Sequence, residues 1–338
     1  MFYDSSEEKT NVCEPSFAYN EIIDEINSAD VLENTIREQM PAILDILLLD
    51  RTSSTTKTKK NIIWANENYL CHGLKAYAPN AQIQPDLVTG INANLIMPRA
   101  LKTRELQKER TKSKAEVFTP IWIVKQQNDL VESNYLEDDL ETYVKRTWLE
   151  ISCGEAPYMA TRYGMETGEL VPIAKRAGFV DRKLARINIE VSDKAEWQRL
   201  VEVAYKSSYG FEWNGDSLLI ARENLLYTYR DYYYSKWQEE PSYGLFEKLA
   251  EIISYNVFQM DGIAKKYGVP KKSSGQYYIL PLSEKKEAKI EVQLSFDLTF
   301  EDTIDDSEMN QFTIIPGKRV KIMNWETNRM EYFDKGVK

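Results

Sequence analysis

Residues 148–159 read WLEISCGEAPYM, and this stretch decides the fold that we expect. Its first four residues resemble a mostly apolar strand, and they lead into a turn of small side chains, SCGEAP. The acid Glu150 lies just before this turn. An acid at a strand end followed by a turn of low bulk is typical of a site that holds a nucleoside cofactor, because small residues let the backbone approach the ligand.

The sequence that follows alternates between helix and strand patterns. We expect helices near 157–163 and at 194–207, 216–237 and 242–256, and strands at 148–151, 208–212 and 257–261. This alternation predicts an α/β fold with a parallel, doubly wound sheet. Residues 18–50 predict helices, and the sequence after Pro270 alternates apolar and polar residues, which predicts a β-rich tail.

Three of the expected strands end in an acid. Glu150 precedes the turn, Glu212 ends SYGFE, and Asp261 ends NVFQMD. In open α/β sheets ligands bind beyond the carboxyl ends of the strands, where one carboxylate can accept both ribose hydroxyls and another can accept an exocyclic amino group. The chain has no G-x-G-x-x-G motif for a pyrophosphate, which favours S-adenosyl-L-methionine (SAM) over NAD.

The composition excludes several classes of protein. It is globular, with 43% hydrophobic and 28% charged residues. No run approaches the roughly 18 apolar residues of a membrane span, and the acidic N-terminus lacks a secretion signal. The single histidine, His72, argues against histidine metal sites and Ser-His catalysis, so no metal is expected. Three widely spaced cysteines predict neither a disulfide framework nor a metal cluster, and they favour the reducing cytoplasm.

One segment is basic although the net charge of the chain is −10. Residues 99–114, RALKTRELQKERTKSK, carry seven basic side chains and two acidic ones. Clustered cations can neutralise DNA phosphates, although a solvated helix face is an equal alternative. The candidate DNA-binding residues are Lys102, Arg104, Lys108, Arg110, Lys112 and Lys114.

Four sequence elements in order resemble the gamma class of amino-DNA methyltransferases. They are VFTP at 117–120, LEISCGEAPYM at 149–159, YGFE at 209–212, and Asp261. Within this class the chain is most similar to bacterial restriction-modification "subunit M" proteins, through phrases such as KNIIWA, MPRALK, VDRKL, YGFEWNGDSLLIARENLL and EIISYNVFQMDGI. The resemblance implies a Rossmann-like SAM-binding core at 115–270, between a helical region with the basic segment at 1–114 and a β-rich extension at 271–338.

The resemblance also implies roles for individual residues. Phe118, Thr119 and Pro120 close over the methionine end of the cofactor, and Glu150 lies near its amino group. The turn is lined by Ser152, Cys153, Gly154 and Ala156, where Ala156 replaces the usual glycine. Glu212 takes the ribose hydroxyls, Phe211 or Trp213 lies beside the adenine, and Asp261 faces the adenine amino group.

Each of these features also has a simpler structural interpretation. A Thr-Pro pair starts many helices, Cys153 is compatible with a small buried side chain, Glu212 with a surface acid beside a helix, and Asp261 with a turn. The run YTYRDYYYSKW at 227–237 predicts helix packing rather than base stacking. Taken singly these signals are weak, and their order along the chain carries the hypothesis.

The sequence departs from the class in its catalytic element. No Asn-Pro-Pro-Tyr, or Asp variant, follows Asp261, so no catalytic residue is assigned, and Asn324-Trp325 lacks a proline. Three hypotheses remain: an adenine-N6 DNA methyltransferase or a subunit completed by a partner chain; an inactive SAM-binding scaffold or regulatory subunit of a restriction or phage-defence assembly; and a DNA-binding adaptor with a vestigial pocket. The retained acids argue against the last.

Overall fold

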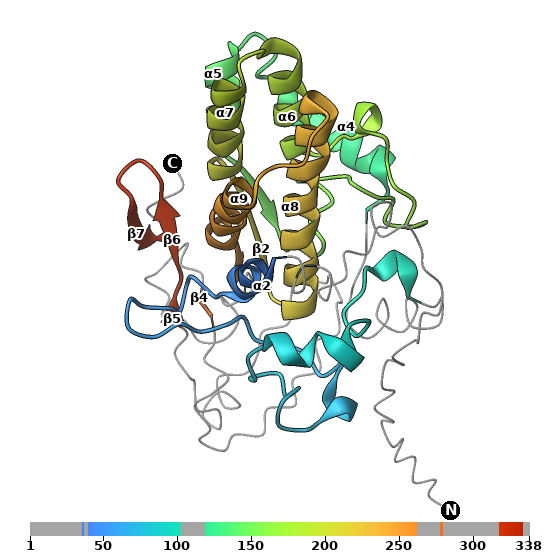
Figure 1. Ribbon diagram of the computed structural model, residues 1–338, viewed down its shortest axis with the longest axis vertical. Coiled ribbons are helices and arrows are strands. Elements are labelled where there is room, and N and C mark those ends of the chain that lie inside the picture. Colours follow the sequence, from blue (N-terminus) through green and yellow to red (C-terminus); the bar gives the residue numbers. More distant parts are fainter. Residues whose placement is uncertain (1–35, 37–39, 103–118, 262–277, 280–317, 334–338) are drawn as a thin grey trace, which may run out of the picture.

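The computed structural model is a mixed α/β protein built on a parallel sheet (Figure 1). It describes residues 36, 40–102, 119–261, 278–279 and 318–333. The α-helices in this part of the chain are α2 (Pro41–Leu48), α4 (Ile121–Glu132), α5 (Leu140–Lys145), α6 (Phe179–Glu190), α7 (Lys194–Lys206), α8 (Gly215–Trp237) and α9 (Tyr243–Asn256). The strands are β1 (Trp148–Ile151), β2 (Ser208–Glu212), β3 (Val257–Gln259), β4 (Tyr278–Ile279), β5 (Lys318–Arg319), β6 (Lys321–Asn324) and β7 (Arg329–Tyr332).

The parallel sheet has the order β1-β2-β3, with β2 in the middle and buried along its whole length. Trp148 pairs with Ser208, and Gly210 pairs with Val257. Helices α6 and α7 connect β1 to β2, and α8 and α9 connect β2 to β3. Because the three strands are parallel, their carboxyl ends meet at one edge of the sheet. The prediction of a parallel sheet joined through helices is therefore confirmed. The doubly wound arrangement is not, because in the described chain the helices of both crossovers pack on one face of the sheet and the C-terminal hairpin packs on the other.

The two faces of the sheet are covered differently. Trp148 and Val257 pack into the main core together with residues of α6, α7, α8 and α9, which lie side by side in Figure 1. On the other face, Phe211 and Phe258 pack against Ile322 and Phe333 from the C-terminal part of the chain. Both crossovers place their helices on the same face, as right-handed connections between successive neighbouring strands require. The hairpin β6-β7 supplies Ile322 to the second face.

Buried polar side chains fix the N-terminal region and the hairpin to the core. Arg222 of α8 donates to the carbonyls of Leu47, Leu49 (3.0 Å) and Val257 (2.8 Å), and so joins the end of α2 to the start of β3. Trp325 Nε1 donates to Asn256 Oδ1 at 2.8 Å, which joins the turn between β6 and β7 to the end of α9. The bonds from the Arg222 guanidinium are charge-assisted, and such bonds are about twice as strong as neutral ones.

Some predicted elements differ in the structure. Residues 157–159 form turns, so the helix expected near 157–163 is wrong. The Pro, Asn and Gly residues at 77–99 predict an irregular connector with short strands, whereas the structure describes short 3₁₀ helices across 70–101: η2 (Leu70–His72), η3 (Pro85–Leu87), η4 (Gly90–Asn92) and η5 (Arg99–Leu101). A further 3₁₀ helix, η6 (Ile173–Lys175), precedes α6. Most of the helical prediction at 18–50 lies outside the described residues, and α2 is the part that they contain.

The cysteines also differ from the prediction. Cys71 is disulfide-bonded, whereas the odd number and wide spacing of the cysteines predicted no disulfide. Cys153 is free and buried. Among the helices that the structure describes, none combines the length and the apolar character needed to cross a bilayer.

Candidate functional site

The turn after β1 has an unusual backbone. Ser152, Gly154 and Ala156 have φ values of 50°, 55° and 61°, so every second residue is left-handed. Side chains other than glycine rarely adopt this conformation, which costs roughly 1–2 kcal/mol for each. Small residues are needed here because they tolerate it best. The backbone N–H of Cys153 donates to the Phe211 carbonyl at 2.8 Å, which extends the pairing of β1 with β2 into the turn.

The carboxylate of Glu212 lies directly against this turn. Its Oε2 accepts the backbone N–H of Gly154 at 2.9 Å. Its Oε1 accepts the backbone N–H and the side-chain amide of Asn214, at 3.0 Å and 3.2 Å. Burial raises the pKa of Glu212 above its usual value. The acid at the end of β2 and the small-residue turn after β1 thus form one unit, as their predicted positions at the same sheet edge require.

Glu150 lies in the same unit but faces the other way along the chain. Its Oε1 accepts the backbone N–H of Tyr158 at 3.2 Å, and its Oε2 accepts that of Met159 at 2.9 Å. Burial, with a smaller contribution from the Glu212 charge, raises its pKa to about 8 although the two backbone bonds act in the opposite direction. Glu150 therefore holds the segment that leaves the turn, a role that the sequence did not predict.

Cys153 packs beneath the turn as a small buried side chain. It is 2% exposed, and a Cβ built on Gly210 of β2 would lie only 3.3 Å from its Sγ and 2.9 Å from the Met159 sulfur. Burial raises the thiol pKa well above its usual value. A buried, protonated thiol is a poor nucleophile, so Cys153 contributes its backbone to the turn and its side chain to packing.

Asp261 follows the last strand at the same sheet edge. The backbone N–H of Met260 donates to the Glu212 carbonyl at 3.0 Å, and Asp261 comes directly after it, half-buried. Trp213 is also half-buried. Its carbonyl accepts Gln259 Nε2 at 2.7 Å. The structure therefore places Glu150, Glu212 and Asp261 at one edge, as the parallel strand order predicted.

Two amides at this edge were missed by the sequence reasoning. Gln259 Oε1 accepts the backbone N–H of Ile63 at 2.9 Å, and its Nε2 donates to the Ile63 carbonyl at 2.8 Å. Asn214 contacts Glu212 as described above. Gln259 thereby fixes the irregular N-terminal region to the end of β3. In the sequence Gln259 is followed by Met260 and Asp261, and no pattern there indicates that its side chain binds the N-terminal region.

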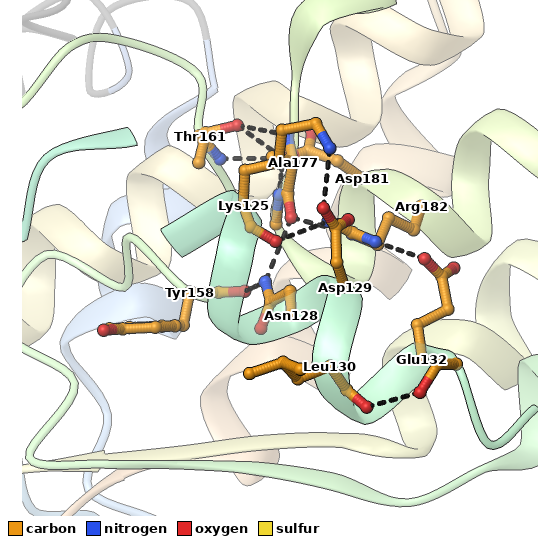
Figure 2. Close-up of polar contacts among 12 residues, drawn as sticks. Lys125, Asn128, Asp129, Leu130, Glu132, Tyr158, Thr161, Ala177, Asp181 and Arg182 are labelled. Atoms are coloured by element: carbon orange, nitrogen blue, oxygen red, sulfur yellow. Dashed lines mark hydrogen bonds and ion pairs between the residues drawn. The ribbon is translucent and has the colours of Figure 1, made fainter. Parts of the chain in front are cut away.

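Helix α4 begins directly after Thr119-Pro120, and a polar cluster fixes it beside the turn (Figure 2). Asn128 is buried and donates to the carbonyls of Tyr158 (3.1 Å) and Ala177 (3.0 Å). Arg182 of α6 donates to Ala177 and Asp129, at 2.9 Å and 2.8 Å, and forms an ion pair with Glu132. This cluster connects the helix that starts after Thr119-Pro120 to Tyr158, the residue that Glu150 holds.

The start of α4 differs slightly from the prediction. Pro120 occupies the N-cap position, and no side chain caps the helix, whereas Thr119 was expected as the cap and Pro120 in the first turn. Thr119 and Pro120 are half-buried. Phe118 lies outside the described residues.

Asp181 closes the loop that returns from the turn to α6. Its Oδ2 accepts the backbone N–H groups of Thr161 (2.7 Å) and Gly178 (3.2 Å). The Thr161 hydroxyl in turn accepts the N–H of Ala177 at 2.7 Å, and Figure 2 shows these three residues Thr161, Ala177 and Asp181 together. Burial raises the pKa of Asp181 to about 6. The loop from β1 to α6 is therefore held at both ends by a buried carboxyl group.

Of the six candidate DNA-binding residues, the described part of the chain contains only Lys102. Lys102 is 6% exposed, which differs from the exposed position that contact with phosphate requires. Arg104, Lys108, Arg110, Lys112 and Lys114 lie outside the described residues.

In α8, Tyr229, Tyr232 and Tyr233 are buried and Tyr234 is 49% exposed. This agrees with the predicted packing role of the tyrosine run.

Comparison of the chain with protein-family models, with curated proteins and with solved structures finds no match.

Proposed function

We propose that this chain is a SAM-binding, DNA (adenine-N6) methyltransferase-like protein of a restriction-modification or phage-defence system. The observation that carries the proposal is the contact between Glu212 Oε2 and the Gly154 N–H. It joins the Glu212 carboxylate, at the end of β2, to the left-handed, small-residue turn that follows the neighbouring parallel strand β1. This is the arrangement that a nucleoside with vicinal hydroxyls needs: a backbone that it can approach and a carboxylate that accepts its O–H groups.

The residues fit the chemistry of SAM in charge as well as in position. Glu150 and Glu212 are buried acids whose pKa values are raised by burial, and the charge of Glu212 also raises the pKa of Glu150. A ligand that carries a sulfonium and an ammonium group favours the ionised form of such acids. When bound, SAM supplies a methyl group that is activated by the positive sulfur.

In this proposal Glu212 accepts the ribose hydroxyls through Oε2, which takes only one hydrogen bond among the described residues, that of Gly154. Asp261 and Trp213 serve the adenine at the ends of the neighbouring strands. Ser152, Gly154 and Ala156 present the turn backbone. Thr119 and Pro120, at the start of α4, cover the methionine end together with Phe118, and Glu150 acts there through the Tyr158–Met159 segment that it holds.

Binding of SAM is tested by isothermal titration calorimetry with the full chain. We expect wild type to bind, and Glu212→Gln to weaken binding about 10–100-fold, as loss of a hydrogen bond to a charged group costs about 1.5–3 kcal/mol. Glu239→Gln is the matched control, because Glu239 is an exposed carboxylate paired with Lys194. Thermal melts check that each variant is folded. Absence of binding by folded wild type, or equal binding by the Glu212 variant, contradicts the proposal.

A second candidate is an inactive scaffold or a regulatory DNA-binding subunit. The observation in its favour is the lack of an Asn-Pro-Pro-Tyr element after Asp261 in the sequence. Transfer of tritium from labelled SAM to DNA, measured with and without the products of neighbouring genes, separates the two. Transfer by the chain alone supports the enzyme, transfer only with a partner supports a catalytic subunit, and SAM binding without transfer in either case supports the scaffold.

DNA as a partner rests on the basic segment at 99–114. Reversal of four charges, at Lys108, Arg110, Lys112 and Lys114, should weaken DNA retention and reduce the slope of its salt dependence. A filter-binding titration at several salt concentrations measures both. Unchanged retention and slope would remove the segment from the DNA interface.

A further inference from the structure

Two buried arginines meet at one aspartate on the far part of α8. Arg162 lies in the loop between β1 and α6, and its Nε is 3.3 Å from Asp231 Oδ2. Arg176 directly follows η6, and its Nη2 is 2.5 Å from the same oxygen. The side chains of Arg162 and Arg176 are 2% and 4% exposed, whereas that of Asp231 is 21% exposed. One carboxylate oxygen therefore faces two guanidinium groups.

Several donors of this pair have no hydrogen-bond partner. Nη1 of Arg162 and Nη1 of Arg176 are buried without a hydrogen-bond partner among the residues that the structure describes, and Arg162 Nε has only its ion pair with Asp231. Arg176 Nε donates to the Val171 carbonyl at 3.0 Å. Two aromatic rings lie nearby: the Tyr227 ring is 5.6 Å from the Arg162 guanidinium carbon, and the Tyr232 ring is 5.9 Å from that of Arg176. Ring faces attract a cation but accept no N–H bond of full strength.

The nearby acid Asp181 does not complete the pairing. Its charge acts on Arg176 at longer range, and its Oδ2 accepts the Thr161 and Gly178 amides. Its Oδ1 is buried without a hydrogen bond, yet no ion pair joins this carboxylate to either arginine within the described chain. A buried guanidinium without enough acceptors is costly, because its N–H groups have lost water. Two guanidinium forks side by side match an oxyanion, which presents several acceptor oxygens at once.

We propose that Arg162 and Arg176 form a binding site for a tetrahedral oxyanion, either free phosphate or the phosphate group of a small molecule. Asp231 is the built-in competitor for this site: it holds the pair together without a ligand, and it yields to an anion with more acceptors. Since Asp231 is the most exposed of the three side chains, the anion enters beside it.

This site is separate from the turn after β1. Asn224 of α8 donates to the Glu155 carbonyl of the turn, and Asp231 lies seven residues further along the helix, about 10 Å away. Among the described residues, no hydrogen bond or ion pair joins the two arginines or Asp231 to Glu212 or Gly154. The inference therefore does not rest on SAM binding, and either can fail without the other.

The test compares thermal unfolding of the full chain in sodium phosphate and in sodium chloride at equal ionic strength. We expect phosphate to raise Tm of wild type, and to raise Tm of Asp231→Asn by more, because the competitor is gone. Calorimetry with inorganic phosphate should show about tenfold tighter binding to Asp231→Asn than to wild type. Adding Arg176→Gln to this variant should abolish the phosphate effect.

The matched control is Arg230→Gln. Arg230 lies on the same helix but pairs with Glu240 outside the cluster, so its phosphate response should equal that of wild type. A second arm with adenosine monophosphate identifies the source: a stronger response than to phosphate supports a phosphate group carried by a larger ligand, and an equal or weaker one supports the free ion. The proposal is overturned if neither wild type nor Asp231→Asn responds to phosphate beyond chloride. It is also overturned if the response survives Arg176→Gln. Should Asp231→Asn fail to fold, wild type against Arg176→Gln decides in the same way.

Discussion

Replacing Glu150 with glutamine tests the electrostatics of the turn. Glu150 is 7% exposed and accepts two backbone N–H groups. Burial moves its pKa from the usual 4.5 to about 8. The folded chain therefore keeps this carboxyl group neutral in a pH range where the unfolded chain ionises it. Glutamine has nearly the same shape and stays neutral at every pH, so it removes the titration together with one of the two accepted N–H bonds.

The direction and size of the effect follow from linkage. Between pH 4.5 and 8 the folded state binds more protons at Glu150 than the unfolded state, so the free energy of unfolding decreases as pH rises. The stabilising contribution is complete below pH 4.5 and is lost as pH passes through about 8. The change of pKa from 4.5 to about 8 corresponds to about 5 kcal/mol at roughly 1.4 kcal/mol for each pH unit. This is large against a total stability of about 5–15 kcal/mol.

The assay is urea unfolding of wild type and Glu150→Gln at pH 5, 6, 7, 8 and 9, followed by tryptophan fluorescence. Glutamine can accept only one of the two N–H groups, which costs about 1–3 kcal/mol at every pH. The variant should therefore be less stable than wild type at pH 5, and the difference should shrink or reverse by pH 9. Glu239→Gln is the control, because its hydrogen bond to Lys194 lowers the pKa of Glu239 and any effect falls below this range.

Two stability curves that stay parallel from pH 5 to 9 would refute the reasoning. They would mean that Glu150 has the same pKa in the folded and unfolded states. The carboxyl group would then reach water in solution, and the turn would be more open than the structure describes.

Three further predictions concern packing around the turn. Gly178→Ala places a Cβ 2.3 Å from a backbone carbonyl oxygen and should lower the free energy of unfolding by at least about 1–3 kcal/mol. Gly244→Ala meets nothing within 4 Å and should raise the free energy of unfolding by about 0.5–1 kcal/mol. Urea melts that rank the two variants otherwise contradict the glycine geometry. Asn128→Ala removes two buried hydrogen bonds, although the Tyr158 and Ala177 carbonyls each keep one other donor, and should cost about 1–3 kcal/mol in the same assay. A neutral result would separate α4 from the turn. Cys153 should resist a thiol reagent in the folded chain and react in urea, and rapid modification of folded protein would contradict its burial.

The sequence predicted those parts of the fold whose cause is local. The helix at 194–207 and the long helix at 216–237 have continuous apolar spacing, and the structure has α7 and α8 within one residue of these limits. The strand at 208–212 was predicted from its apolar run and matches β2. Parallel order followed from the alternation of these elements.

The failures arose where tertiary contacts override local preference. The segment after the turn reads as a helix start, but its N–H groups at Tyr158 and Met159 bond to Glu150 instead of forming a helical turn. The sequence GFVDRKLARI at 178–187 predicts only a short element, yet α6 has 12 residues because Asp181 and Arg182 fix its first turn to neighbouring segments. No local pattern in the sequence encodes such partners.

The candidate site was predictable to the same extent. Parallel strands bring their carboxyl ends to one edge, so the positions of Glu150, Glu212 and Asp261 followed from strand order alone. The direction in which each carboxylate points did not follow from it. The Glu150 carboxylate accepts the N–H groups of Tyr158 and Met159, which follow the turn. The Glu212 carboxylate accepts the N–H of Gly154 within the turn, because the left-handed backbone of Gly154 presents it there.

The strain in this turn is itself informative. Ser152 and Ala156 hold left-handed backbone at a cost of roughly 1–2 kcal/mol each, and glycine at both positions would avoid it. Such strain persists only where the surroundings over-determine the conformation, and here Glu212, Phe211 and Cys153 do so through three backbone bonds. In a turn with a purely structural role, the strain of two left-handed residues would offset part of the stability that these three hydrogen bonds contribute. A turn whose outward backbone must meet a ligand gains a rigid surface, which is the physical reason to look for the ligand at Gly154 and Glu212 before any other place in the chain.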